Sequence, residues 1–442
     1  VLNPVSYAVV FDLDDTLAVT DRDRKTLLSA AADRASITLS FDRAAYRKAH
    51  REHSGTRTRE PVFEALVGED APEMTRAYRE AVGEALEGDY ITRGPTVEAF
   101  EERVAEFVGV EHAVATTSGT TALHLAGRAA GFGPGDEVIT TPLTFASTAH
   151  VATYCGAEPV FADIDPHLRS LDPDAVREQV TDQTAGIVPM HYAGQPADIE
   201  GLLEVADGHD LTVIWDACHA FGGSWNGEMI GAQRDMVMFS FHPVKNITTG
   251  EGGMVVTDDD ELAERLRRLR SFDMEYSPEG HDDEPWYQVT EGLGYNYNVT
   301  DLQAALGLAQ LEKVEEFKRS RDEIVAEYNE AFQDIDGIRT PPEPVNADPM
   351  YHLYAVKIEE AFSCGRKEFI NAMHDENIGV QVHYVPLHYH PYFQEEYDYE
   401  RGQFPDTEAV YDGLVSLPLH AEMDGGDTRD VVTAVQRLYE HQ

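Results

Sequence analysis

The hydrophobic and polar positions of the chain alternate between two patterns from about residue 96 onward. Helical spacing of apolar residues predicts helices near 96–107 and 120–131. Short and nearly continuous apolar runs then predict buried strands, in the order EVITT, PVFADI, AGIVPMHY, LTVIWDA and MVMFSF. Strands that alternate with helices favour an α/β fold with a mostly parallel, doubly wound sheet.

Two stretches depart from this alternation. At the N-terminus, a strand-like run at 6–13 is followed by a highly charged helical stretch, and Gly88-Asp89 interrupts the pattern. We therefore expect a separate segment over residues 1–88. The second stretch, 272–290, is rich in Asp, Glu, Gly and Pro and predicts an exposed loop.

The C-terminal part mixes both kinds of element. A long amphipathic helix at 300–332 precedes strands in YHLYAVKI and GVQVHYV and helices at 366–376 and 426–440. This order predicts a large domain over 89–334 and a small α+β domain over 335–442.

Acidic residues dominate the charge of the chain. The 81 Asp and Glu residues outnumber the 34 Lys and Arg residues, which gives a formal net charge of −47. Such a field repels nucleic acid and anionic membranes, so we exclude both as partners. The acidity is spread along the chain, and at molar salt the screening length is only about 3 Å. We therefore expect a halophilic protein from a salty cytoplasm.

The cysteines and the first apolar run indicate the compartment. Cys155, Cys218 and Cys364 lie far apart and form neither a metal-binding spacing nor a disulfide framework. The apolar run from Tyr7 to Phe11 is too short to span a bilayer. We expect a cytoplasmic protein in a reducing environment.

Lys245 is the most informative residue of the sequence. It is the only lysine between Lys48 and Lys313, and it lies in the apolar stretch FSFHPVKNITTGEGG. Burial of its ammonium group is costly, whereas a desolvated lysine amine can form a Schiff base with a carbonyl. The alternative is a lysine whose charged end reaches the surface.

Three further segments suggest what Lys245 binds. Asp216 ends the apolar run VIWDACHA, and a carboxylate at a strand end could pair with a protonated ring nitrogen. In TTSGTTALHLA, small residues lead into a helix whose N-terminus suits a phosphate at Gly119 and Thr120. Phe145, in TTPLTFAST, could stack on an aromatic ring. Taken singly, these residues also suit a capped turn, a helix cap and a core aromatic.

The chain contains five short motifs in a fixed order: SGTTAL, TPLTF, WDACHA, SFHPVK and GEGG. Together these motifs resemble those of the sugar-nucleotide aminotransferases of the DegT/StrS type. These enzymes have the fold type I architecture of pyridoxal 5'-phosphate (PLP) enzymes, and the resemblance extends from about Tyr90 to the C-terminus. Within this family, the chain is most similar to enzymes that aminate UDP-linked 4-keto-6-deoxy-N-acetylhexosamines, as in pseudaminic acid synthesis. The segments that carry this similarity are HYAGQPADIE, FSFHPVKNITTGEGGMVVT and VHYVPLHY. Some relatives are dehydratases with histidine in place of the lysine; Lys245 favours transamination.

The resemblance implies roles for individual residues. Lys245 would carry PLP covalently and shuttle a proton, Asp216 would bind the ring nitrogen, and Asn296 would reach the phosphate in the partner subunit of a homodimer. The other cofactor contacts implied are His219 at the phenolic oxygen, Phe145 on the ring, and Gly119, Thr120 and Ser240 at the phosphate. The residues implied for the sugar pocket are Gly94, Pro95, Tyr192, His352, His383, Tyr384 and His388.

The same resemblance implies the reaction: a nucleotide-linked 4-keto-6-deoxy sugar becomes its 4-amino sugar, with L-glutamate as donor, in polysaccharide biosynthesis. We expect no metal among His383, His388 and His390, because no cysteine is near and the following carboxylates lack zinc spacing. A non-catalytic regulator that binds PLP or a sugar is a competing hypothesis.

The N-terminal run VVFDLDDTL resembles the first motif of haloacid dehalogenase-type phosphatases, in which Asp12 and Asp14 would share Mg²⁺. A phosphosugar phosphatase is therefore an alternative function. However, the segment before residue 89 contains no strand ending in Ser or Thr, no suitably placed lysine and no later acidic pair. We expect a partial haloacid dehalogenase-like segment without activity of its own.

Overall fold

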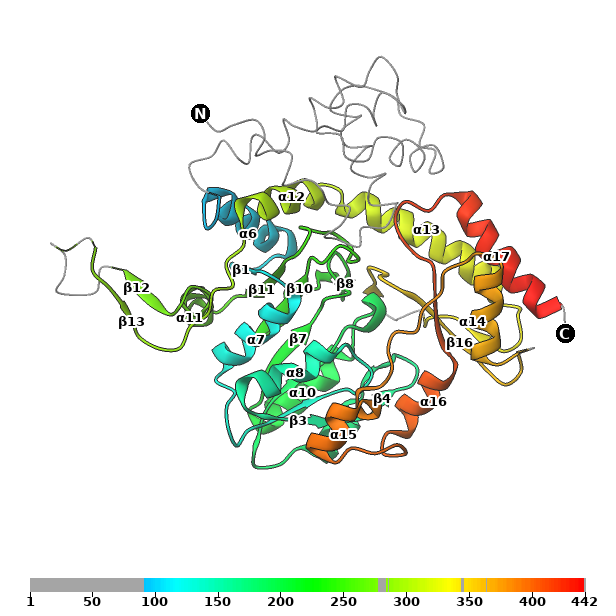
Figure 1. Ribbon diagram of the computed structural model, residues 1–442, viewed down its shortest axis with the longest axis horizontal. Helices are drawn as coiled ribbons and strands as arrows, with labels where there is room; N and C mark the ends of the chain where they lie inside the picture. Colours follow the sequence, from blue (N-terminus) through cyan, green and yellow to red (C-terminus); the bar gives the residue numbers. More distant parts are fainter. Residues whose placement is uncertain (1–90, 277–283, 285, 343–345, 363, 441–442) are drawn as a thin grey trace, which may run out of the picture. The chain divides into compact units, whose positions relative to one another are not determined.

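The computed structural model describes residues 91–276, 284, 286–342, 346–362 and 364–440. Apart from Ile91, the described residues belong to the unit Thr92–Gln442 (Figure 1). The segment predicted for residues 1–88, with its resemblance to a phosphatase motif at Asp12 and Asp14, lies outside the described residues.

Within the described residues, a seven-stranded sheet has the order β1-β11-β10-β7-β6-β2-β3. The strands β10, β7, β6, β2 and β3 run parallel, whereas β11 is antiparallel to both of its neighbours, so the mostly parallel sheet is confirmed. All five predicted apolar runs contain a strand of this sheet, and β1 and β11 were not predicted. The strands are β1 (His112–Thr116), β2 (Glu137–Thr140), β3 (Glu158–Phe161), β6 (Thr184–Val188), β7 (Thr212–Asp216), β10 (Met236–Ser240) and β11 (Gly253–Thr257).

Helices cover both faces of this sheet. In β7, Val213 and Trp215 pack against one helical layer, and Ile214 between them packs against the other. Because successive side chains of a strand point to opposite faces, a run of apolar residues is needed to fill both layers. The first layer contains α6 (Pro95–Val108), α9 (Pro173–Gln179), α10 (Ile199–His209) and α12 (Asp301–Leu311). The second layer contains α7 (Gly119–Ala130), α8 (Ala146–Cys155) and α11 (Asp260–Arg270).

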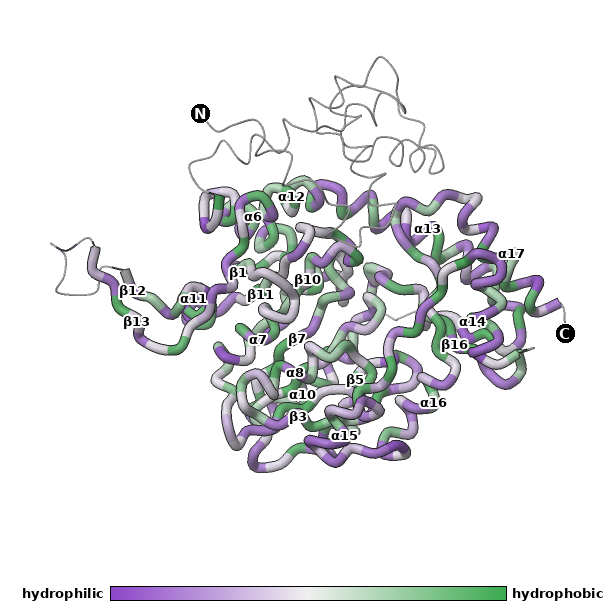
Figure 2. Tube along the Cα trace, in the orientation of Figure 1, coloured by the Kyte–Doolittle hydropathy of each residue, from purple (hydrophilic) through white to green (hydrophobic). Residues whose placement is uncertain are grey.

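A second core lies in the C-terminal part. Ile324, Tyr328 and Phe332 of one helix pack against a small sheet of order β14-β16-β17 and against two further helices. In Figure 2, hydrophobic positions lie along the central strands, and many peripheral loops are hydrophilic. The elements of this core are α13 (Val314–Phe332), β14 (Ile338–Arg339), β16 (Tyr354–Ile358), α14 (Arg366–Asp375), β17 (Leu414–Leu417) and α17 (Gly425–Glu440).

Shorter elements complete the unit. They are β4 (Ile164–Asp165), β5 (Ser170–Leu171), η3 (Tyr192–Gly194), β8 (Ser224–Trp225), β9 (Glu228–Met229), β12 (Met274–Tyr276), β13 (Gln288–Thr290), β15 (Ala347–Asp348), η4 (Leu387–Tyr389), α15 (Pro391–Tyr397) and α16 (Pro405–Gly413). None of the described helices is long and apolar enough to cross a membrane.

Three local predictions were wrong. The helix predicted at 300–332 is divided into α12 and α13 by a turn at Glu312 and Lys313. GVQVHYV is not a strand: it joins the small sheet only through an isolated bridge from Gln381 to Ser416. The stretch predicted as a loop at 272–290 contains the paired strands β12 and β13, which project beyond α11 in Figure 1.

Candidate active site

Lys245 follows β10 in a tight turn, in which its backbone N–H donates to the carbonyl of His242 at 2.9 Å. The side chain is partly buried. Burial lowers the pKa of the amine, and the neighbouring Cys218 and Asp216 oppose this effect. The amine forms no hydrogen bond or ion pair with any described residue. It is therefore available to react with a carbonyl group.

Asp216 ends the neighbouring strand β7, and its carboxylate is buried, with 2% of the residue exposed. Its Oδ2 accepts a hydrogen bond from Thr148 Oγ1 at 2.7 Å, and its Oδ1 accepts one from the backbone N–H of Cys218 at 3.1 Å. Its own N–H donates to the carbonyl of Pro189 at 2.8 Å. Because each carboxylate oxygen can accept a further hydrogen bond, Asp216 can also bind a cationic N–H group.

His219 lies three residues beyond Asp216 and is fully buried. Its Nδ1 accepts a hydrogen bond from the backbone N–H of Ala193 at 3.3 Å, and its Nε2 lies 3.1 Å from the hydroxyl of Tyr384. Burial lowers the pKa of His219 well below its ordinary value, and the charge of Lys245 lowers it further. His219 is therefore neutral at neutral pH.

His352 and His383 extend this group. The ring of His352 lies 4.3 Å from that of His219, and its Nδ1 is 3.1 Å from Asn246 Oδ1. The Nδ1 of His383 lies 2.9 Å from the hydroxyl of Ser416. Burial, followed by the charge of Lys245, lowers the pKa of both rings, that of His383 to about 4.

Tyr192 supports the segment that contains His383 and Tyr384. Its hydroxyl donates to the carbonyl oxygen of His383, and its side chain is buried. Burial raises the pKa of Tyr192, so the hydroxyl stays protonated and remains a donor at neutral pH.

The N-terminus of α7 meets the end of β10. The side chain of Ser118 caps the helix and forms a capping box with Thr121. A Cβ atom at Gly119 would lie 2.9 Å from the Cβ of Ser240, so only glycine allows this close approach. Thr120 Oγ1 lies 2.7 Å from Ser147 Oγ at the start of α8. The N–H groups of the helix N-terminus and the hydroxyls of Thr120 and Ser240 thus lie at this end, which suits a phosphate.

Phe145 lies at the rim of the group. It precedes α8, 56% of its surface is exposed, and its ring lies 5.9 Å from that of Tyr384. Val244 and Val385, which flank Lys245 and Tyr384 in the sequence, are exposed as well. Three apolar side chains therefore stand beside the residues that carry the polar chemistry.

The remaining predicted site residues make other contacts. His388 is buried with its Nε2 3.0 Å from Glu408 Oε1, and the N–H of Gly94, which precedes Pro95, donates to Asp301 Oδ2 at 3.0 Å. Asn296 is exposed, and its Oδ1 accepts a hydrogen bond from Asn298 at 2.9 Å. None of these contacts involves Lys245 or its neighbours.

Two residues that contact the site were not predicted from the sequence: Thr148 and Asn246. Thr148 binds the carboxylate of Asp216, and the side chain of Asn246 donates to the carbonyl oxygens of His219, Phe221 and Met350. The position of Asn246 directly after Lys245 was the one available signal. Thr148 is the last residue of the segment TTPLTFAST, but its partner is 68 residues away, so the segment alone does not reveal the contact.

The comparisons with known proteins identify this arrangement. The family model for the DegT/DnrJ/EryC1/StrS aminotransferases matches residues 72–436. The chain belongs to this family. Enzymes of the family are PLP-dependent sugar aminotransferases, which confirms the enzyme class, the fold type and the cofactor predicted from the sequence.

Individual relatives support the same conclusion. The spore coat polysaccharide biosynthesis protein SpsC of Bacillus subtilis is 44% identical over 365 residues, which cover 81% of this chain and 93% of SpsC. PseC of Helicobacter pylori, an aminotransferase involved in the biosynthesis of pseudoaminic acid, is 30% identical with a TM-score of 0.76. The alignment covers 82% of this chain and 96% of PseC. Spr1654 of Streptococcus pneumoniae, solved in its PLP form, is 26% identical, with a TM-score of 0.76 and coverage of 82% and 96%.

The residues around Lys245 fit PLP. The enzyme offers an amine with a lowered pKa, a buried carboxylate that can accept a further N–H group, and a helix N-terminus beside Ser240. A Cβ atom at Gly253 would lie 2.3 Å from the carbonyl oxygen of Ser118, so glycine is required behind this helix end as well.

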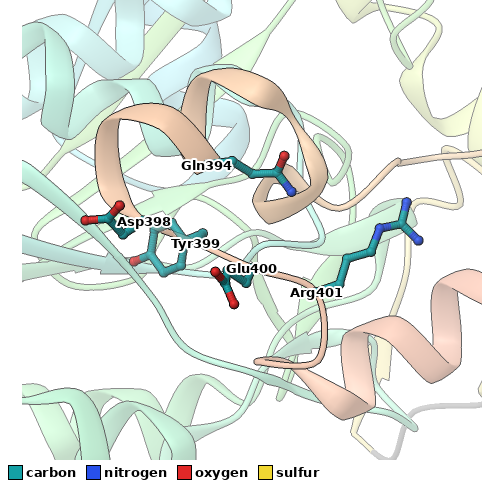
Figure 3. A pocket seen from close by; sticks show the side chains of 5 residues that line it. All are labelled: Gln394, Asp398, Tyr399, Glu400 and Arg401. Atoms are coloured by element: carbon teal, nitrogen blue, oxygen red, sulfur yellow. The ribbon is translucent and has the colours of Figure 1, made fainter.

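Two surface pockets lie away from this group. One, of about 290 Å³, is formed by α15 and the loop after it (Figure 3). It is lined by Gln394, Asp398, Tyr399, Glu400 and Arg401. The other, of about 350 Å³, lies between the end of α10 and Arg234. Neither contains a predicted site residue, so we place the chemistry at Lys245. Among the described residues, no cluster of three or more His, Cys, Asp or Glu side chains is arranged to hold a metal ion.

Proposed function

We propose that the enzyme transfers an amino group from L-glutamate to a 4-keto-6-deoxy sugar attached to a nucleotide. The observation that carries the aminotransferase chemistry lies at the ends of two neighbouring strands: Asp216 ends β7 with His219 after it, and Lys245, whose amine has no partner among the described residues, follows β10. The likeness to PseC and the segments HYAGQPADIE and VHYVPLHY support a UDP-linked N-acetylhexosamine.

The proposed cofactor contacts follow from the chemistry of each side chain. Lys245 would hold the aldehyde carbon of PLP, and Asp216 its protonated ring nitrogen. His219 would face the phenolic oxygen, and Phe145 would cover the ring. Gly119, Thr120 and Ser240 would bind the phosphate through helix N–H groups and hydroxyls. When bound, PLP supplies an electron sink for breaking the C–H bond of the donor.

Lys245 also supplies the proton-transfer group. Once its amine is released from the cofactor, it can take the proton from Cα of the donor and return a proton to C4 of the sugar. Burial favours the neutral amine that this task needs, because it lowers the pKa of Lys245. Asp216 would hold the ring nitrogen during both steps.

We assign the sugar end of the site to His352, His383 and Tyr384, and Tyr192 holds the segment of His383 and Tyr384 in place through its hydroxyl. The two rings are neutral at neutral pH because burial lowers their pKa, and the two phenols stay protonated because burial raises theirs. Neutral donors and acceptors suit the hydroxyl and keto groups of an uncharged sugar ring.

We further propose a homodimer in which Asn296 reaches the phosphate bound by the partner subunit. Asn296 is exposed and follows the projecting strands β12 and β13. The neighbouring Phe272, Trp286 and Leu293 are exposed apolar residues, as are Phe145, Val244 and Val385 beside the site. A second copy of the chain would cover both groups.

Incubation with glutamate and a panel of UDP-linked keto-sugars, followed by mass spectrometry, tests the proposal. A 4-amino product from a 4-keto-6-deoxy-N-acetylhexosamine is the expected result. If every keto-sugar returned unchanged while the enzyme retained bound PLP, the substrate proposal would be wrong. Turnover only with another sugar class would replace the substrate and leave the aminotransferase assignment in place.

A further inference from the structure

A chain of three buried side chains ends on the carboxylate of Asp216. Thr144 Oγ1, in the segment after β2, lies 2.7 Å from Thr148 Oγ1 in the first turn of α8. Thr148 Oγ1 in turn lies 2.7 Å from Asp216 Oδ2 at the end of β7. Both threonines are fully buried, so water does not compete for these hydrogen bonds.

The direction of the hydrogen bonds follows from the acceptors. A carboxylate has no hydrogen to donate, so the single hydroxyl hydrogen of Thr148 goes to Asp216. The oxygen of Thr148 can then accept the hydrogen of Thr144. Thr144 Oγ1 also lies 2.9 Å from the sulfur of Met190, but a thioether is a weak acceptor. The chain therefore runs from Thr144 through Thr148 to Asp216, and each bond polarises the next.

We propose that Thr148 is a positioning residue for the reaction: it fixes the Asp216 carboxylate, in its charged form, toward the ring nitrogen of the cofactor. This inference rests on the proposed role of Asp216. The backbone N–H of Cys218 holds the other oxygen at 3.1 Å, so two donors from different segments restrain the carboxylate. A hydrogen bond to a charged acceptor is stronger than one between neutral groups.

The consequence for catalysis is electronic as well as geometric. A carboxylate that loses a hydrogen-bond donor binds a proton more tightly. Without Thr148, a proton shared between Asp216 and the ring nitrogen would shift toward Asp216. The electron sink would weaken, whereas the sugar pocket, which is built from other residues, would be unchanged.

Thr148→Val in the full-length holoenzyme removes the hydroxyl and keeps the shape of the side chain. We expect kcat to fall about tenfold, the size of one hydrogen bond to a charged group, with KM for the sugar unchanged. The pH dependence of the absorbance of bound PLP should shift. Thr148→Ser keeps the donor and should restore both properties.

Thr140→Val is the matched control. Thr140 is equally buried at the end of β2, but its hydroxyl donates to the carbonyl of Val188 at 2.6 Å. Thr148→Val loses the bond to Asp216 and the bond from Thr144, whereas Thr140→Val loses one buried hydrogen bond, so both cofactor-free proteins should lose thermal stability. Only Thr148→Val should alter kcat and the spectrum, and identical kinetics and spectra for the two variants would overturn the proposal.

Two further variants keep the outcomes distinct. Should Thr148→Val not fold, Thr144→Val removes the donor to Thr148 without touching Asp216, and we expect about a threefold loss of kcat. No loss would again overturn the proposal. Asp216→Asn tests the role of Asp216 separately from that of Thr148. Full turnover in this variant would refute the role of Asp216 itself. If Asp216→Asn loses turnover while Thr148→Val keeps wild-type kinetics, only the inference about Thr148 is refuted.

Discussion

The Nε2 of His219 lies 3.1 Å from the hydroxyl of Tyr384, while its Nδ1 accepts the backbone N–H of Ala193. Since His219 is neutral and its Nδ1 is an acceptor, the ring hydrogen is on Nε2 and is donated to the Tyr384 oxygen. The hydroxyl hydrogen of Tyr384 is then available for a different acceptor. No described residue is a second partner of this hydroxyl.

Tyr384→Phe should therefore lower activity, and it should also lower stability, because the N–H of the buried His219 loses its acceptor. We expect kcat/KM for the keto-sugar to fall about tenfold, because one hydrogen-bond donor to the substrate is lost. Steady-state kinetics and the melting temperature of the cofactor-free protein measure the two effects. A variant with wild-type kcat/KM would show that the hydroxyl does not bind the substrate.

His191 should make the stability of the enzyme sensitive to acid. Burial lowers the pKa of His191 to about 3, its ring is stacked on Trp215, and its Nε2 has no hydrogen-bond partner among the described residues. Below the ordinary pKa of 6.5, the unfolded chain therefore binds a proton that the folded chain does not. The free energy of unfolding then falls by about 1.4 kcal/mol per pH unit as the pH decreases from 6.5 toward 3.

His191→Gln keeps an acceptor for the N–H of Ala197, which His191 Nδ1 binds at 3.0 Å, and removes the titration. Urea unfolding at fixed salt should give a flatter pH dependence for this variant than for the wild type. His209→Gln, at the exposed end of α10, is the control and should keep the wild-type slope. Equal slopes for all three proteins would contradict the argument.

Assembly and activity should depend together on salt. Each subunit has a formal charge of −47, so two copies repel each other at low ionic strength. At molar salt the range of this repulsion is only about 3 Å, which permits association. Light scattering and turnover should therefore decrease in parallel on dialysis to low salt.

A variant at Asn296, measured at high salt, tests the proposed contact with the partner's phosphate. Asn296→Ala should leave the dimer intact at high salt and weaken PLP binding about tenfold, because one phosphate contact is lost. A monomer with full activity, or a dimer indifferent to salt, would show that either Asn296 or the acidic surface has been misinterpreted.

Asp12→Ala should leave amination unchanged, and the wild-type enzyme should show negligible Mg²⁺-dependent phosphatase activity. A phosphatase nucleophile needs charge-stabilising partners, which the sequence before residue 89 lacks. Phosphate release from a phosphosugar measures this activity. Release by the wild type that is lost in Asp12→Ala would make the enzyme bifunctional.

Local chemistry made much of the fold predictable from the sequence. The five strands of the parallel region are apolar runs because both of their faces are buried; Asp216 ends one of them, and Lys245 follows another. The antiparallel strand β11 was missed because its first residue, Gly253, belongs to the glycine-rich stretch after Lys245.

The contacts that complete the site could not be predicted in this way. The bond from Thr148 to Asp216 and that from His352 to Asn246 join residues 68 and 106 positions apart. Such pairs depend on how the layers pack and leave no periodic signal. Likewise, the contact of His388 with Glu408 joins two helical segments and leaves no signal in VPLHY.

The most direct test of the central claim uses isotopically labelled glutamate, a UDP-linked 4-keto-6-deoxy-N-acetylhexosamine, the wild type and Lys245→Ala. With the wild type, mass spectrometry should find the labelled nitrogen in the sugar product. Borohydride reduction of the holoenzyme should attach the cofactor to the peptide that contains Lys245. Lys245→Ala should give neither signal, because no other lysine lies between Lys48 and Lys313. Labelled product from Lys245→Ala at a near-normal rate would contradict the account.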